Sequence, residues 1–198
     1  MRLFSTRVML VFISLIVLSG FSSSDYTLLL KSGKYHLAEG EISQNITGAS
    51  VNGYYYRIMQ FYAVPSQARK IEMQNLGIIF FDYLPKNAFL VAIPEDIDAT
   101  KISQFNVRSI ALVQKEMKFS KNLSAGEIPF WSVDGNGNAA LVLGYYPNLA
   151  KREVSQALEA LGATFNYNGD DGFVNITIST QKLDLLSAHP LFYYIQES

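Results

Sequence analysis

The chain has 198 residues, of which 49% are hydrophobic, so it carries enough apolar material for a packed core and does not resemble a disordered protein. With 16 Lys and Arg against 17 Asp and Glu, the formal net charge of −1 gives no electrostatic footprint for nucleic acid or for an anionic membrane. The lack of cysteine excludes disulfides, a thiol nucleophile and thiolate metal sites, so stability must come from packing.

The first 24 residues have the pattern of a secretory signal peptide. Arg2 and Arg7 precede an apolar run from Val8 to Phe21, and small residues follow it. The run is about 14 residues long, whereas a membrane-spanning helix needs roughly 20. We therefore expect cleavage between Gly20 and Ser24 and a secreted or extracytoplasmic protein, in the periplasm or outside the cell. An uncleaved membrane anchor is the alternative.

The next segments are a lead and a first folded module. Residues 25–53 are expected to hold one strand, Tyr26 to Leu30, followed by a polar stretch. Residues 54–117 are expected to form the module, which begins with a β-rich run from Tyr54 to Val64. Ser66 is placed to cap a helix over residues 67–76, and Gly77 to end it.

The rest of the first module reads as a hairpin, a short helix and a final strand. Strands over residues 78–83 and 88–93 are separated by the turn residues Pro85, Lys86 and Asn87. Asp98 is placed to cap a helix over residues 98–105, and a strand over residues 107–114 follows. The predicted order is βαββαβ.

Residues 118–138 are expected to be a linker that ends in the flexible run Asp134 to Asn138. Ile128, Phe130 and Trp131 make it too apolar for a solvated tether. We expect this cluster to pack against one module or across both.

Residues 139–198 repeat the βαββαβ order as a second module. Strands are expected over residues 139–146, 163–167, 173–179 and 191–196, and helices over residues 149–161 and 181–188. In the third strand Val174, Ile176 and Ile178 alternate with polar residues, which predicts one core face and one polar face. Both modules therefore predict an α+β fold of two tandem ferredoxin-like modules, with antiparallel sheets and helices on one face.

An internal repeat supports this organisation. When Gly77 is placed on Gly162, an offset of 85 residues, apolar positions coincide without gaps. Phe80 then meets Phe165, and the match extends to the pairs Ile58 with Leu143, Phe89 with Val174, Val91 with Ile176 and Ile110 with Ile195. Common origin of the two halves explains this better than chance.

The sequence offers little for catalysis. The two histidines, His36 and His189, lie in no recognisable catalytic context; His36 is expected at the surface and His189 at a helix C-terminus. Asp170 and Asp171 lie in a glycine-containing turn rather than in an acid pair. No metal-ligand spacing or nucleotide-binding fingerprint is present, so we expect no enzyme activity, no metal and no cofactor.

The aromatic segments 54–56 and 192–194 suit sheet packing, although an exposed tyrosine stripe would also suit a protein partner.

Several stretches resemble a known family. The segment from Asp82 to Pro94, DYLPKNAFLVAIP, is the most specific, and residues 55–61, 76–77 and 107–110 match more loosely. They resemble the N-terminal prodomain of secreted bacterial subtilisin-like serine proteases over about residues 54–198. The second module resembles the inhibitor-type propeptide of that family.

The resemblance implies a function and a site. In the family, the ferredoxin-like propeptide packs its sheet against the protease, templates its folding and blocks the substrate cleft with the segment after its last strand. Here this implies contacts with a protease catalytic domain, in cis or in trans, by the C-terminal residues Tyr193, Tyr194, Ile195, Gln196, Glu197 and Ser198. The 198 residues hold none of the Asp, His and Ser motifs of a catalytic domain, so the chain is expected to be part of a longer precursor or to act in trans. The alternative is a cell-envelope protein-binding module with tandem ferredoxin-like domains and no protease.

Overall fold

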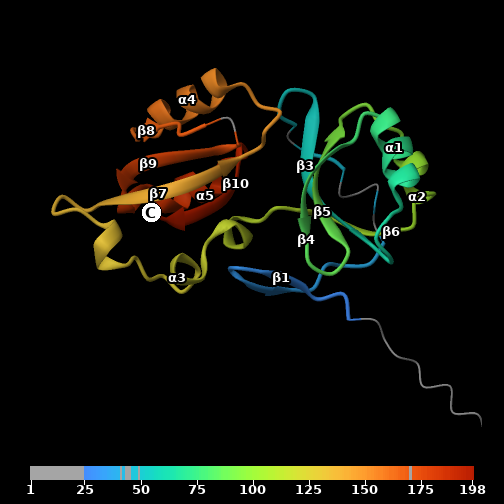
Figure 1. Ribbon diagram of the computed structural model, residues 1–198, viewed down its shortest axis with the longest axis horizontal. Coiled ribbons are helices and arrows are strands. Elements are labelled where there is room, and N and C mark those ends of the chain that lie inside the picture. Colours follow the sequence, from blue (N-terminus) through green and yellow to red (C-terminus); the bar gives the residue numbers. More distant parts are fainter. Residues whose placement is uncertain (1–24, 41, 43–45, 49, 170) are drawn as a thin grey trace, which may run out of the picture.

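The computed structural model describes residues 25–40, 42, 46–48, 50–169 and 171–198 (Figure 1). The signal peptide predicted for residues 1–24 lies outside the described residues. The fold is α+β, built from antiparallel sheets and short helices. Two four-stranded sheets lie side by side, each with its own helices, and a small hairpin lies beside them (Figure 1).

The first module contains four strands and two helices in the predicted order. They are β3 (Tyr54–Phe61), α1 (Gln67–Asn75), β4 (Ile79–Leu84), β5 (Ala88–Pro94), α2 (Ala99–Ser103) and β6 (Val107–Leu112). The sheet order is β4-β5-β3-β6, and each neighbouring pair is antiparallel.

The second module repeats this arrangement. Its elements are β7 (Asn138–Tyr145), α4 (Lys151–Ala160), β8 (Thr164–Asn166), β9 (Phe173–Ser179), the 3-10 turn η3 (Thr180–Lys182), α5 (Leu183–Ala188) and β10 (Phe192–Glu197). The sheet order is β10-β7-β9-β8. Read from the other edge, as β8-β9-β7-β10, it matches the order β4-β5-β3-β6 of the first module strand for strand. Both topologies are compatible with ferredoxin-like modules.

The helix boundaries follow the predicted caps. Ser66 accepts a hydrogen bond from the amide of Arg69, and Asp98 accepts one from the amide of Thr100 at 2.9 Å. Gly77 and Gly162 follow the two long helices with φ angles of 87° and 71°. Only glycine adopts these values without strain, which is why both helices end there.

The strand registers confirm most of the repeat and correct one match. Phe80 pairs with Val91, and Phe165 pairs with Ile176, so these positions correspond as predicted. The match of Ile58 with Leu143 is wrong by one residue. Met59 pairs with Phe89 and Ile110, as Leu143 pairs with Val174 and Ile195, so Met59 corresponds to Leu143. The second module has one more residue between its first strand and the glycine that ends its first helix.

Each module has a core between its sheet and its helices. In the first module, Met73 of α1 and Ile102 of α2 pack with Met59 and Val91 of the sheet, and all four are fully buried. In the second module, Val154 and Leu158 of α4 and Leu186 of α5 are also fully buried, in one cluster with Leu141 and Ile178. Burial of this kind contributes the main favourable free energy of folding.

The N-terminal lead contains two strands, not the one predicted. β1 (Leu28–Leu30) pairs with β2 (Gly33–Tyr35) as an antiparallel hairpin. Gly33, with φ 151°, allows the chain to reverse after Ser32, so that part of the polar stretch returns as β2. Leu28 is fully buried, which fixes the hairpin to the rest of the protein.

The connection between the modules is more structured than a linker. It contains η1 (Lys115–Lys118), α3 (Lys121–Ser124) and η2 (Phe130–Ser132). The predicted packing of its aromatic pair is wrong, because Phe130 is 87% and Trp131 65% exposed. Ile128 packs on the core and Ser132 is buried, and the 3-10 turn between them directs both rings outward. Among the described residues, no helix has the length and apolar character to cross a membrane.

Candidate functional site

The six predicted site residues lie in or directly after the edge strand β10. Ile195 pairs with Leu143 and Glu197 with Leu141 of β7, and the amide of Ser198 donates to the carbonyl of Ala140 at 3.0 Å. Ile195 is fully buried in the core. In this structure the residues therefore extend a sheet, and their contact with a protease stays a prediction.

The side chains of this strand contact two other parts of the chain. Lys31 of the N-terminal hairpin donates to the Tyr194 hydroxyl at 2.7 Å and to Gln196 Oε1 at 3.5 Å. The Glu197 carboxylate accepts hydrogen bonds from the Ser120 hydroxyl and the Asn122 side-chain amide. Strand β10 thus fastens the hairpin and the inter-module connection to the second sheet.

Tyr193 points to the junction of the two modules. Its ring lies 5.3 Å from that of Tyr146, and Gly144 leaves room for it, since a Cβ there would be 2.9 Å from Tyr193 Cζ. Burial and the nearby carboxylate of Asp82, a residue of β4, raise the pKa of Tyr193 above its usual value. The hydroxyl therefore stays protonated at neutral pH.

The second sheet keeps an open face, on the side away from α4 and α5. Asn175 and Thr177 of β9 lie on it, opposite Val142 and Ala140 of β7, and neither polar side chain is buried. Thr164, Asn166 and Gln196 continue the same face on the flanking strands. This confirms the predicted alternation in β9 and leaves a mostly polar surface, which Lys31 reaches at Gln196.

The first sheet has no such open face. The sequence analysis did not predict that both of its faces are covered. Ile58, Leu90 and Ala92 face away from α1 and α2 and are at most 3% exposed, because they share a cluster with residues of the second module and of the hairpin. The rings of Tyr56 and Tyr146 stack at 3.9 Å between the modules. The missed signal was the uninterrupted apolar run of β5, since a strand covered on both faces does not alternate.

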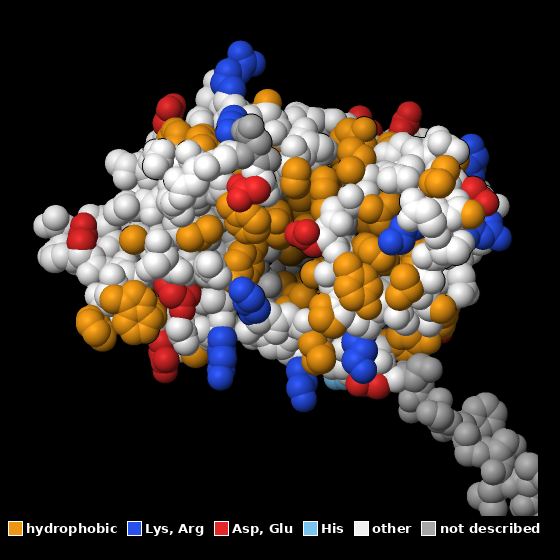
Figure 2. Space-filling model, viewed as in Figure 1, with side chains coloured by type: hydrophobic (Ala, Val, Ile, Leu, Met, Phe, Trp, Pro, Cys, Tyr) orange, Lys and Arg blue, Asp and Glu red, His pale blue; other side chains and the backbone are white. Residues whose placement is uncertain are grey.

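An apolar groove remains where the hairpin, the first sheet and β10 meet. On the face seen in Figure 2, hydrophobic side chains gather along the hollow between the two halves. The groove has a volume of about 330 Å³, and its lining includes Leu29, Leu84, Leu90 and Tyr193.

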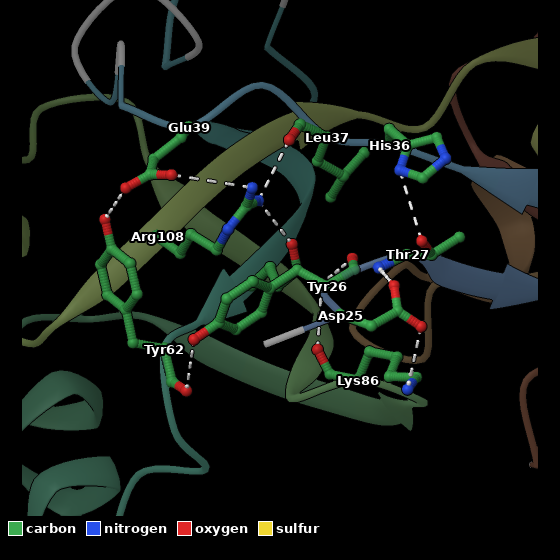
Figure 3. A network of polar contacts seen from close by, with 10 residues as sticks. Asp25, Tyr26, Thr27, His36, Leu37, Glu39, Tyr62, Lys86 and Arg108 are labelled. Atoms are coloured by element: carbon green, nitrogen blue, oxygen red, sulfur yellow. Dashed lines mark hydrogen bonds and ion pairs between the residues drawn. The ribbon is translucent and has the colours of Figure 1, made fainter. Parts of the chain in front are cut away.

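A polar network fixes the N-terminal segment to the first module (Figure 3). Arg108 of β6 donates through Nη1 to the carbonyl of Leu37 and to Gln60 Oε1, both at 3.0 Å, and forms an ion pair with Glu39 at 3.9 Å. Its guanidinium also lies 4.6 Å from the centre of the Tyr26 ring.

The network continues to the start of the described chain. Gln60, which is fully buried, donates to the carbonyls of Tyr26 at 2.9 Å and Lys86 at 3.0 Å. Asp25 accepts hydrogen bonds from the hydroxyl and amide of Thr27 and pairs with Lys86 at 3.3 Å, which lowers the pKa of Asp25 to about 2. These contacts attach the segment to the first module.

The two histidines lie directly after β2 and directly after α5. His36 is exposed, as predicted, and its Nδ1 lies 3.3 Å from the Thr27 hydroxyl. His189 follows α5, and burial together with the Lys118 cation holds its pKa below the usual value. Asp170 lies outside the described residues, and within the described part no three His, Asp or Glu residues form a group that could hold a metal ion.

Comparison with known proteins adds one similarity. Residues 29–114 match the model of a family described as a domain of unknown function, DUF8729. No curated protein and no solved structure matches the chain. The matched segment runs from the N-terminal hairpin through β6, so what this chain shares with that family is the hairpin together with the first module.

Proposed function

We propose that this chain is the non-catalytic propeptide region of a secreted subtilisin-like protease, acting as a folding chaperone and inhibitor of the catalytic domain. In this proposal residues 1–24 are a signal peptide, the protein is extracytoplasmic, and the two modules are tandem ferredoxin-like copies of common origin. No cofactor takes part.

The observation that best supports this function is the open face of the second sheet. A propeptide of this family packs its sheet against the protease, and the second module has a four-stranded face free of its own helices. Polar, uncharged side chains such as Asn175 and Thr177 can be covered by a partner without burying a charge. The adjacent strand β10 carries the residues that the resemblance assigns to the protease contact.

Inhibition of a subtilisin-like protease encoded by the same organism tests the proposal. The chain from residue 25 to 198 is added to the active protease, and the initial rate of peptide hydrolysis is measured. We expect inhibition at micromolar concentration, weakened at least tenfold by Thr177→Arg, which adds bulk and charge to the open face without touching the core. Gln74→Arg, on the exposed side of α1, is the matched control and should inhibit like the wild-type chain. Absence of inhibition by the wild-type chain would refute the proposal.

A second candidate function is protein binding in the cell envelope without a protease. It is favoured by the covered face of the first sheet, because a chain with two inhibitory copies would offer two open sheets. A photo-crosslinking amino acid at position 177 distinguishes the candidates, since it should capture a protease catalytic domain under the first and an envelope protein under the second.

A further inference from the structure

A cavity at the junction of the modules, beside β6, differs from the groove and the open face described above. Its volume is about 440 Å³, within the range of small-molecule sites. The N-terminal lead contributes Val51 to its wall, the first module contributes Leu112, and the second module contributes Ser187 and Pro190.

The charged residues of this cavity are unusual in their burial. Among the described residues, two charged side chains are buried, Arg57 at 5% and Lys118 at 4% exposure. Both are cations and both line this cavity. No Asp or Glu is among the described residues that line it.

Lys118 has no acidic partner in the described part of the chain. Its ammonium group donates to the carbonyl of His189 at 2.8 Å, and none of the described carboxylates lies within ion-pair distance of it. A buried ammonium group costs free energy unless a negative charge compensates it. Desolvation accordingly lowers the pKa of Lys118 to about 8, which still leaves it mostly protonated at neutral pH.

The neighbouring groups leave this positive charge in place. His189 is neutral at pH 7, because burial and the Lys118 cation lower its pKa. Lys115, at the rim, forms its own ion pair with Asp184 at 2.6 Å. The Arg57 guanidinium donates to the carbonyls of Tyr56 and Thr47, both at 2.8 Å. The cavity therefore combines apolar walls with the buried ammonium group of Lys118, which pairs with none of the described carboxylates.

We propose that this cavity binds a carboxylate ligand with an apolar body, with its carboxylate at Lys118 and its body against Val51, Leu112 and Pro190. A carboxylate matches the buried Lys118 ammonium group through a charge-assisted hydrogen bond. A fatty acid and the C-terminal end of an apolar peptide share this chemistry. Since both modules contribute wall residues, the ligand joins them; this site is independent of the proposed protease contact.

Calorimetric titration of the full chain tests the site with two acids and their uncharged counterparts. The probes are octanoate against octanamide, and N-acetyl-leucyl-phenylalanine against its C-terminal amide. We expect the acid of one pair to bind at least tenfold more tightly than its amide, and the pair that responds identifies a lipid or a peptide source. Equal affinity of acid and amide in both pairs, or no binding by either acid at millimolar concentration, would overturn the proposal.

Variants at Lys118 test whether its ammonium group binds the carboxylate of the ligand. Lys118→Met should weaken the binding of the acid at least tenfold and leave that of the amide unchanged, whereas Lys118→Arg should retain most of the affinity. Lys121→Met, on the exposed side of α3, is the matched control. If Lys118→Met does not fold, the comparison of acid and amide on the wild-type chain decides alone. Binding of the acid by folded Lys118→Met with wild-type affinity would contradict the assignment.

Discussion

The stacked pair Tyr56 and Tyr146 provides a direct measure of the coupling between the modules. The rings lie 3.9 Å apart with an interplanar angle of 25°, and the residues are 5% and 1% exposed. Such a pair contributes about 1 kcal/mol beyond the area it buries. The Tyr56 hydroxyl also donates to Asn148 Oδ1 at 3.1 Å, which adds about 1 kcal/mol.

These terms predict the outcome of a double-mutant cycle. We expect Tyr56→Leu and Tyr146→Leu each to lower the free energy of unfolding by about 2–3 kcal/mol. The loss in the double variant should be smaller than the sum of the two single losses by about 1 kcal/mol. Tyr56→Phe keeps the stack and should lose only the hydrogen bond, about 1 kcal/mol. Guanidinium unfolding followed by far-ultraviolet circular dichroism measures all four variants. Additive effects within about 0.3 kcal/mol would show that the rings do not interact, and the inter-module packing would be refuted.

Three further predictions concern single positions. Gly144→Ala should destabilise the protein by about 1–3 kcal/mol, because the new Cβ would lie 2.9 Å from the Tyr193 ring. Gly135→Ala is the control and should not destabilise it, because a Cβ there would have nothing within 4 Å. Equal effects of the two variants in denaturant unfolding would contradict this reasoning. Burial lowers the pKa of Lys118 to about 8 in the folded protein, so the unfolded chain, with its solvated ammonium group, holds this proton to higher pH. Stability should therefore rise by about 1 kcal/mol between about pH 8 and pH 9, below the range in which tyrosines of the unfolded chain ionise, and Lys118→Met should remove that rise; a flat wild-type profile would speak against the burial of the ammonium group. Trp131, the single tryptophan, is 65% exposed, so its fluorescence emission should shift little on unfolding, and Trp131→Ser should change stability by less than about 0.5 kcal/mol. A strongly blue-shifted native emission would contradict this placement.

Local signals in the sequence were sufficient for the elements of the two modules and their order. The caps Ser66 and Asp98 and the glycines Gly77 and Gly162 act through their own backbone, so their effect does not depend on the rest of the fold. The alternation in β9 was equally reliable, because only one of its faces is buried.

Long-range packing was harder to predict. The aromatic pair at Phe130 and Trp131 was expected to be covered because of its composition, yet its exposure depends on a 3-10 turn held by Ile128 and Ser132 on either side. The cavity beside Lys118 was missed for a similar reason, since Lys118 is the first residue of the predicted linker. Its burial arises only when α5 of the second module packs over η1.

The candidate site was only partly foreseen. The resemblance singled out residues 193–198 for a protease contact, and the structure shows a paired edge strand there, which contacts Lys31, Ser120 and Asn122. Nothing in the local pattern of the strand predicts these partners, because they come from distant parts of the chain.

The covered face of the first sheet has a consequence for how the protein is made. Ile58 and Leu90 leave the ribosome well before Tyr146 and the strands that follow it, so the nascent chain presents a bare apolar β surface while its cover is still untranslated. Chains interrupted before residue 146 should therefore accumulate as insoluble material, even though every strand and helix of their first module is present.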